Sequence, residues 1–247
     1  PISGIGATCT AEGTFELDAS IMEGKDLSAG AVAGLKHVKH PINAAYAVKT
    51  KSPHVMLSGA GAEEFAKEQG LEMVEDNMYF ATPKTMEWIE KLKQESKKNG
   101  TVGCVVLDKQ GNLTAGTSTG GMFKKRWGRI GDSPVIGAGT YADNNSCAVS
   151  CTGHGEYFIR HAVAFDVCAR YKYLKESVEK AADYIIHTEL NTNAGNGGLI
   201  AVDKLGNIAM PYNSGGMFRG FLYKEKGSPE IKKGCGIGKK IVVVGEK

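Results

Sequence analysis

The sequence predicts an α+β fold in which two β-sheets are sandwiched between layers of helices. Strand patterns flank a pair of consecutive helical patterns and then resume, unlike the regular strand–helix alternation of a parallel α/β sheet. Residues 101–107 are almost wholly apolar and β-branched, which is typical of a strand covered on both faces. With 247 residues, 42% of them hydrophobic, the chain can bury the core of one large domain or of two small ones.

The first hundred residues mix short strands with helices. Strict alternation of polar and apolar residues, or a short apolar run, indicates strands over residues 14–21, 29–38 and 54–58. Helical periodicity follows over residues 63–69 and 83–98.

The second of these helices carries a start signal and leads into a boundary. Thr82 can cap it, and Pro83 suits its first position. Residues 91–99 are so polar that they indicate a solvated helix end or a linker. We place the best internal boundary there, which divides the chain into residues 1–100 and 101–247.

A β-hairpin follows the boundary. Residues 101–107 and 113–119 are strand-like, and residues 108–112 between them supply turn residues. We expect the first of these strands to be central in its sheet.

Further strands and helices complete the pattern. We expect strands over residues 134–141 and 146–151, and helices over residues 154–171 and 175–187. Residues 202–208 then repeat the hairpin pattern of residues 107–113 in the same register. An ancient duplication would explain this repeat, but we favour two equivalent hairpins at related places in one or two sheets.

Composition excludes several classes of function. Thirty basic and 27 acidic residues give a net charge of only +3, so nucleic-acid binding is not expected. No stretch is apolar over the length of a membrane span. The cysteines lack the short paired spacing of a zinc site, so we expect no metal centre, free thiols in buried strands and helices, and a reducing, cytoplasmic location. They are Cys9, Cys104, Cys147, Cys151, Cys168 and Cys235.

A candidate nucleophile opens the strand after the boundary. If the bond between Gly100 and Thr101 were cut, Thr101 would carry both a hydroxyl nucleophile and an α-amine that titrates near neutrality and can act as its base. Thr119 or Thr117, on the partner strand, could hydrogen-bond this hydroxyl. Threonine is also an ordinary strand residue, so each motif alone is weak evidence.

Candidate substrate-binding groups follow in a basic loop. We expect residues 124–126 to be solvated surface. Arg129 differs because Gly128 and Gly131 permit close approach, and a guanidinium can bind a carboxylate through two hydrogen bonds. Asp132 could hold an ammonium group at the same place, although an internal salt bridge between Arg129 and Asp132 is the alternative.

A strand passes through two glycines into a helix at residues 151–156. Such a junction directs backbone N–H groups at one point, which suits an oxyanion or a carboxylate. His154 lacks an accompanying serine or cysteine nucleophile, so we expect it to be a polar residue at the helix start rather than a catalytic base.

Taken together, these motifs resemble the plant-type asparaginase and isoaspartyl peptidase family. The resemblance extends from about residue 4 to residue 221, and its motifs are residues 16–22, 52–56, 100–103, 117–122, 128–134 and 151–156. It implies a four-layer αββα sandwich of the N-terminal-nucleophile hydrolase type. It also implies an inactive precursor that cuts itself before Thr101 into two subunits.

The resemblance assigns a role to each candidate residue. It implies Thr101 as nucleophile, Thr119 as its hydroxyl neighbour, Thr152 and Gly153 as the oxyanion hole, Arg129 and Asp132 as the groups that bind the substrate α-carboxylate and α-amine, and Gly155 as a backbone contact. The implied substrates are L-asparagine and β-aspartyl dipeptides. No cofactor is required, although a structural or activating Na⁺ or K⁺ ion is compatible with the family, and the implied assembly is an (αβ)₂ dimer.

The sequence also departs from the family. The usual first strand, which ends in His-Gly-Gly, is missing, Ile2 stands where an asparagine is expected, and the linker before Thr101 is short. We therefore expect the chain to represent part of a longer gene product. The alternatives are a glycosylasparaginase, a threonine endopeptidase, and a non-catalytic remnant that binds an amino acid.

Overall fold

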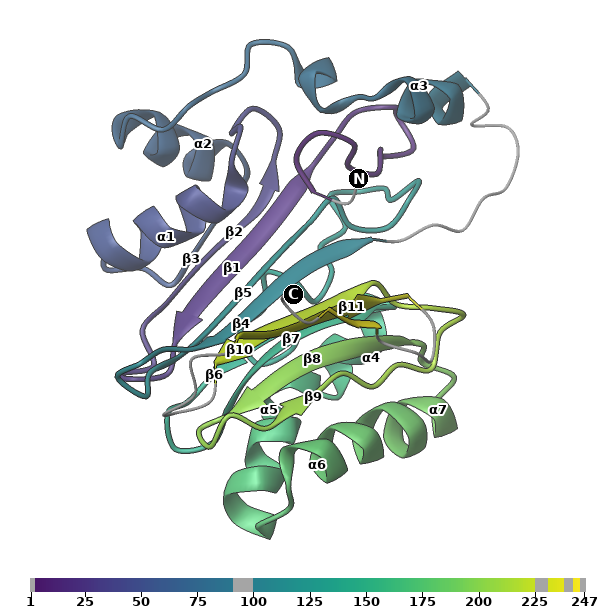
Figure 1. Cartoon of the computed structure of the whole chain (residues 1–247). Helices are drawn as coiled ribbons and strands as arrows, with labels where there is room; N and C mark the ends of the chain where they lie inside the picture. Colours follow the sequence, from purple (N-terminus) through teal and green to yellow (C-terminus); the bar gives the residue numbers. More distant parts are fainter. Residues whose placement is uncertain (1–2, 91–99, 225–230, 238–241, 245–247) are drawn as a thin grey trace.

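The protein consists of two main β-sheets that face each other between layers of helices (Figure 1). The computed structural model describes residues 3–90, 100–224, 231–237 and 242–244. Helices α1 (Pro41–Lys51) and α2 (Gly59–Glu68) cover the outer face of one sheet, and helices α5 (Val163–Ala169) and α6 (Val178–Tyr184) cover the outer face of the other. The predicted αββα layering is therefore confirmed.

The first sheet combines strands from both sides of residue 100. It contains β1 (Leu17–Glu23), β2 (Ala29–Leu35), β3 (Met56–Ser58), β4 (Thr101–Leu107) and β5 (Leu113–Thr119), in the order β3-β2-β1-β5-β4. All neighbours are antiparallel except β2 and β3, which are parallel.

The predicted position of β4 is wrong. This strand lies at the edge of the sheet, and Val102 and Val106 are 52% and 46% exposed. An apolar, β-branched run indicates that a strand forms, but the number of neighbours it gains depends on pairing with distant segments.

Helix α1 was not predicted, although Pro41 stands at its first position and Ala44, Ala45 and Val48 form its buried face. It approaches β2 very closely, since a Cβ atom at Gly30 would lie 2.0 Å from the Ala45 carbonyl oxygen. The glycine therefore sets the distance between the helix and the sheet.

Helix α3 (Pro83–Glu90) begins as predicted. Thr82 Oγ1 accepts a hydrogen bond from the backbone N–H of Thr85 at 3.2 Å, and Thr85 Oγ1 accepts one from the N–H of Thr82 at 2.8 Å. A 3₁₀ turn (Asn77–Phe80) precedes it. The rest of the predicted helix and the predicted linker, residues 91–99, lie outside the described residues.

The second sheet contains β6 (Thr140–Ala142), β7 (Cys147–Gly153), β8 (Gly197–Asp203) and β9 (Ile208–Ala209), in that order. The strand predicted over residues 134–141 is therefore mostly wrong. The backbone turns there instead, because Val135 N–H donates to the Asp132 carbonyl and Gly139 N–H donates to the Val135 carbonyl.

The helices that cover the second sheet are more broken than predicted. They are α4 (Gly155–Arg160), α5, α6 and α7 (Leu190–Thr192), with π-helical turns at Arg170–Leu174 and Ile185–Glu189. The helix predicted over residues 154–171 breaks at Ala162, whose φ of 45° is left-handed.

The two similar hairpins lie in different sheets. Asp108 Oδ1 accepts from the backbone N–H groups of Gln110 and Asn112, at 2.9 and 2.7 Å. Asp203 Oδ1 accepts from the equivalent groups of Leu205 and Asn207, both at 2.9 Å. The structure therefore has two equivalent hairpins at related places in two sheets, an arrangement that an ancient duplication would also produce.

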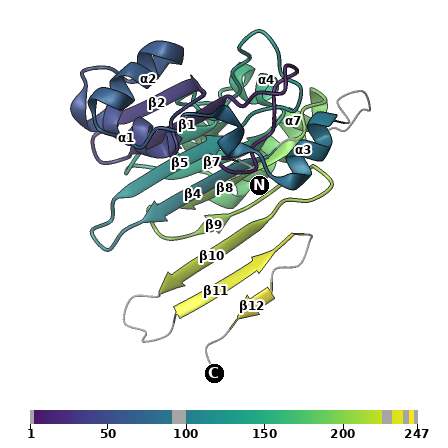
Figure 2. The same ribbon diagram turned by 90° about the horizontal axis from the view of Figure 1, so that it is seen from above.

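The C-terminal residues form a third sheet, which projects beyond β9 (Figure 2). Its strands are β10 (Arg219–Lys224), β11 (Ile231–Gly236) and β12 (Val242–Val244). All six cysteines are free thiols, but Cys104 on β4 and Cys235 on β11 are exposed, which corrects the expectation that all would be buried. No helix in the described ranges is long and apolar enough to cross a membrane.

Candidate active site

The pairing of β4 with β5 places Thr101 directly opposite Thr119. Thr119 Oγ1 accepts hydrogen bonds from the Thr101 hydroxyl at 3.3 Å and from Gly121 N–H at 2.9 Å, and it donates to the Gly100 carbonyl oxygen at 2.8 Å. One hydroxyl therefore connects the candidate nucleophile to the peptide bond that it would attack.

Thr117 is not the residue that hydrogen-bonds the Thr101 hydroxyl. It faces the second sheet, where its hydroxyl lies 2.7 Å from Ser150 Oγ and donates to the Gly139 carbonyl at 3.2 Å. Of the two threonines that the sequence offered, Thr119 is the neighbour of Thr101.

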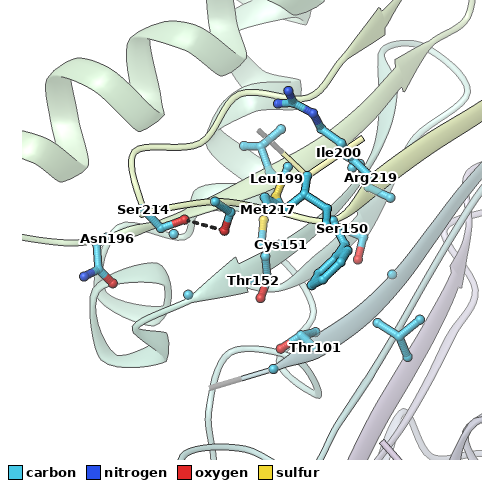
Figure 3. Close-up of a pocket in the computed structure, with 18 of the residues that line it drawn as sticks. Thr101, Ser150, Cys151, Thr152, Asn196, Leu199, Ile200, Ser214, Met217 and Arg219 are labelled. Carbon is cyan, nitrogen blue, oxygen red and sulfur yellow. Dashed lines mark hydrogen bonds between the residues drawn. The ribbon is translucent and has the colours of Figure 1, made fainter. Parts of the chain in front are cut away.

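The second sheet supplies Thr152 and Gly153 from the end of β7. Both line a cavity of about 1510 Å³ together with Thr101, and Figure 3 shows the Thr101 and Thr152 hydroxyls pointing toward one another. Gly153 packs tightly, since a Cβ atom there would lie 2.4 Å from the Asn196 carbonyl oxygen and 2.6 Å from the Phe158 ring. A side chain at this position would push the strand end away from its neighbours.

Arg129 forms its ion pair with a residue that sequence reasoning missed. Its Nε and Nη2 atoms donate to the two carboxylate oxygens of Glu156, both at 2.9 Å, so the alternative of an Arg129–Asp132 salt bridge is not the arrangement found. This contact lowers the pKa of Glu156. The remaining nitrogen, Nη1, lies beside Gly131 and Gly121, where added Cβ atoms would be 2.8 and 3.5 Å away.

Asp132 is buried beside Arg129. Its Oδ2 atom has no hydrogen-bond partner within the described part of the chain, and burial raises the pKa of this carboxyl to about 7, although the charge of Arg129 opposes the rise. A Cβ atom at Gly155 would lie 2.9 Å from both Arg129 Nη2 and Asp132 Oδ1. The glycine thus lets the cation and the carboxylate lie at one place.

These residues share a second, small cavity. Its lining brings together Gly100, Thr101, Thr119, Arg129, Asp132 and Gly153. The expected hydroxyl, guanidinium and carboxyl groups are therefore neighbours in space.

His154 lies at the start of α4, as expected. Its backbone N–H donates to the Asn196 carbonyl at 2.9 Å, and its Nε2 lies 3.5 Å from Glu156 Oε2. Across the described residues, no group of three or more His, Cys, Asp or Glu side chains could hold a metal ion.

The loop before Arg129 corrects another expectation. Residues 124–126 were expected to be solvated, but Lys125 is only 4% exposed, and its ammonium group donates to the Glu16 carbonyl at 2.9 Å. Arg126 is exposed, and Trp127 beside it is 95% exposed. A run of basic residues gives no signal for which of its members turns inward.

Known proteins are similar to this chain over most of its length. Residues 2–231 match the family described as Asparaginase. The chain is 48% identical to an isoaspartyl peptidase of Salmonella typhimurium, over 90% of this chain and 75% of the relative. It is 43% identical to a probable isoaspartyl peptidase/L-asparaginase 2 of Arabidopsis thaliana, over 88% of this chain and 76% of the relative. It is 40% identical to an isoaspartyl peptidase/L-asparaginase of Homo sapiens, over 87% and 72%. The chain therefore belongs to the asparaginase family of N-terminal-nucleophile hydrolases.

Proposed function

We propose that this protein cuts its own chain between Gly100 and Thr101 and then hydrolyses L-asparagine and β-aspartyl peptides. The observation that carries the proposal is the Thr119 hydroxyl, which lies between the Thr101 hydroxyl and the Gly100 carbonyl. The names of the relatives, isoaspartyl peptidase and L-asparaginase, support the same chemistry.

Self-cleavage would begin with attack of Thr101 Oγ1 on the Gly100 carbonyl carbon. The peptide C–N bond breaks as the new C–O ester bond forms, and the nitrogen of Thr101 gains the proton that its hydroxyl loses. Thr119 suits this step because it accepts a hydrogen bond from the attacking hydroxyl and donates one to the carbonyl oxygen that becomes negative. Water then hydrolyses the ester and leaves a free α-amine on Thr101.

Substrate hydrolysis would use the same hydroxyl, with the new α-amine as its base. In our proposal Arg129 binds the α-carboxylate, and Asp132, whose Oδ2 atom lacks a partner among the described residues, binds the α-ammonium. Gly155 has no side chain and so leaves room for the Arg129 guanidinium and the Asp132 carboxyl beside each other. The β-carbonyl would then face Thr101 and the Thr152 and Gly153 donors, and ammonia or an amine would leave.

An α-linked aspartyl peptide would be rejected by this arrangement. Its α-carboxylate is part of the peptide bond, so the guanidinium of Arg129, although still paired with Glu156, would lose its contact with a substrate carboxylate. The loss of a charged contact in a partly buried site is severe. Specificity for the β-linkage therefore follows from the proposed roles of Arg129 and Asp132.

We extend the proposal to the assembly and its surroundings. The resemblance to the family supports an (αβ)₂ dimer of processed chains in the cytoplasm, with no required cofactor and a Na⁺ or K⁺ ion as a compatible structural or activating ligand. Light scattering of the processed protein tests whether it is a dimer. Assays in alkali-metal-free buffer test whether a Na⁺ or K⁺ ion is needed for activity.

Parallel assays test the substrate assignment. The purified, processed protein should hydrolyse L-asparagine and β-Asp-Leu but not α-Asp-Leu. Turnover of α-Asp-Leu would contradict the proposed binding of the α-carboxylate. Preferred cleavage of N-acetylglucosaminyl-asparagine would make the protein a glycosylasparaginase, and binding of aspartate without any turnover would make it a non-catalytic remnant.

A further inference from the structure

A buried group of charges lies behind the candidate site, and the proposed chemistry does not use it. Lys125 is its cation: the side chain is 1% exposed, and Nζ donates to the Glu16 carbonyl at 2.9 Å and lies 3.8 Å from Glu16 Oε2. Burial lowers the pKa of Lys125, and the charges of Asp18 and Glu16 oppose that change. A lysine is buried at this cost only where negative charge surrounds it.

Asp18 is the buried carboxylate of the same group. In the pairing of β1 with β5 it stands opposite Thr119, which in turn stands opposite Thr101 on β4. Its side chain is fully buried; Oδ1 accepts from Gly34 N–H at 2.8 Å, whereas Oδ2 has no hydrogen-bond partner in the regions that the structure describes. An unsatisfied buried carboxylate oxygen attracts any cation that can reach it.

The charges of two cations act on this carboxylate. A Cβ atom at Gly121 would lie 3.3 Å from Lys125 Nζ and 3.5 Å from Arg129 Nη1, so both cationic groups border one glycine. Burial raises the pKa of Asp18, and the charges of Lys125 and Arg129 both oppose the rise. Asp18 therefore attracts both cations, which lie beside each other at Gly121.

We propose that Lys125 is a positioning residue, whose ammonium compensates Asp18 so that the guanidinium of Arg129 stays directed at the substrate α-carboxylate. Lys125 acts through Arg129 and does not touch the substrate. Without it, the Asp18 carboxylate draws Arg129 inward, away from its place beside Glu156. The inference rests on the proposed function, because it concerns the carboxylate that Arg129 binds there.

The test removes each charge singly and then both together. Lys125→Met keeps the length of the side chain but leaves Asp18 uncompensated, so we expect KM for L-asparagine to rise at least about tenfold with little change in kcat. Asp18→Asn, which keeps the acceptor for Gly34, should change KM by less than about threefold. The double variant Asp18→Asn/Lys125→Met should return KM to within about threefold of wild type, because neither charge remains.

A matched control is the ion pair between Lys49 of helix α1 and Glu23 of strand β1. Lys49 is also buried, with a side chain 7% exposed, and it pairs at 2.7 Å with Glu23 at the other end of β1. Lys49→Met removes a comparable ion pair away from Arg129, so its KM should equal that of wild type. Thermal unfolding of every variant separates effects on stability from effects on KM.

The outcomes decide the inference separately from the proposed function. An unchanged KM in Lys125→Met, or a raised KM that the double variant does not restore, overturns the positioning role. If Lys125→Met does not fold, the double variant decides: a wild-type KM supports compensation, and a KM raised tenfold overturns it. If the wild type hydrolyses no substrate, the proposed function fails, and calorimetric binding of L-aspartate replaces KM as the measurement. The inference then predicts weaker binding by Lys125→Met than by the wild type, and binding like that of the wild type by the double variant. Equal binding by the wild type and Lys125→Met overturns the inference in that case.

Discussion

Asp132 is the residue whose chemistry depends most on its surroundings. It is buried against Arg129 with Oδ2 lacking a partner among the residues described, and burial raises its pKa to about 7. Because its pKa in the folded protein lies far above that of an ordinary carboxyl, the free protein holds this proton up to neutral pH. In its proposed role Asp132 binds the substrate ammonium as an ionised carboxylate, so that role couples substrate binding to the loss of this proton.

This coupling predicts how affinity changes with pH. Below pH 7 a bound ammonium must first displace the proton, so the dissociation constant for L-aspartate should rise by about tenfold for each unit below pH 7 and level off above it. Calorimetric titrations between pH 5.5 and 8.5 measure this. Asp132→Asn should bind weakly at every pH, without the slope; a flat profile in the wild type would remove Asp132 from the ammonium site.

Most residues of the candidate site could be found from the sequence because short local motifs contain them. Thr101 follows a glycine at the start of a strand, and Arg129 and Asp132 lie beside glycines in one loop. Lys125 could not be found in this way, since its buried partner Glu16 lies 109 residues earlier in the chain. The Glu156 partner of Arg129 had a weak signal, because it directly follows Gly155 in a recognised motif.

At the scale of elements, helix α1 is held against the first sheet by a glycine. A Cβ atom at Gly30 on β2 would lie 2.0 Å from the Ala45 carbonyl oxygen and 2.6 Å from the Lys49 nitrogen, both of which are backbone atoms of α1. A side chain can turn away from such a clash, but a helix backbone must move as a whole. Overpacking of this kind typically costs about 1–3 kcal/mol.

We therefore predict opposite effects of alanine at two glycines. Gly30→Ala should lower the free energy of unfolding by about 1–3 kcal/mol or more. Gly61→Ala in α2, where an added Cβ meets nothing within 4 Å, should leave it unchanged or raise it by up to about 1 kcal/mol through helix propensity. Urea unfolding curves measure both, and equal stability of the two variants would contradict the packing of α1 on β2.

Elements whose determinants lie close together in the sequence were predicted well, and elements that depend on contacts with distant segments were predicted poorly. The β4–β5 hairpin combines an apolar strand and a threonine-rich strand with a turn, in which the Asp108 side chain accepts hydrogen bonds from the residues just after it. All its determinants therefore lie within a few residues. The edge position of β4 depends instead on its pairing with β5 alone among the described strands. The break at Ala162 accompanies hydrogen bonds from Ala164 and Phe165 N–H, in the first turn of α5, to carbonyl oxygens of residues 137–138. Patterns in sequence report the face that a segment buries and not the partner that buries it.

At the scale of the whole molecule, the candidate site is built where the two sheets meet. β4 and β5 of the first sheet bring Thr101 and Thr119, and β7 of the second brings Thr152 and Gly153. Figure 1 shows the two sheets facing each other, and Figure 3 shows Thr101 and Thr152 in the pocket. Strands β1 to β3 precede residue 100, so cleavage before Thr101 would leave both fragments paired within one sheet. The sheet hydrogen bonds between β1 and β5 would then hold the processed protein together.

Intact-mass measurement of the purified protein tests the central claim most directly. We predict two fragments whose masses sum to that of the chain plus one water, the second of them beginning at Thr101. Thr101→Ala should remain a single chain, whereas Thr114→Ala, on β5 opposite Val106 and away from Gly100, should be cut like the wild type. A Thr101→Ala variant that is cut at the same bond, or an uncut wild type that hydrolyses asparagine, would contradict Thr101 as the self-activating nucleophile.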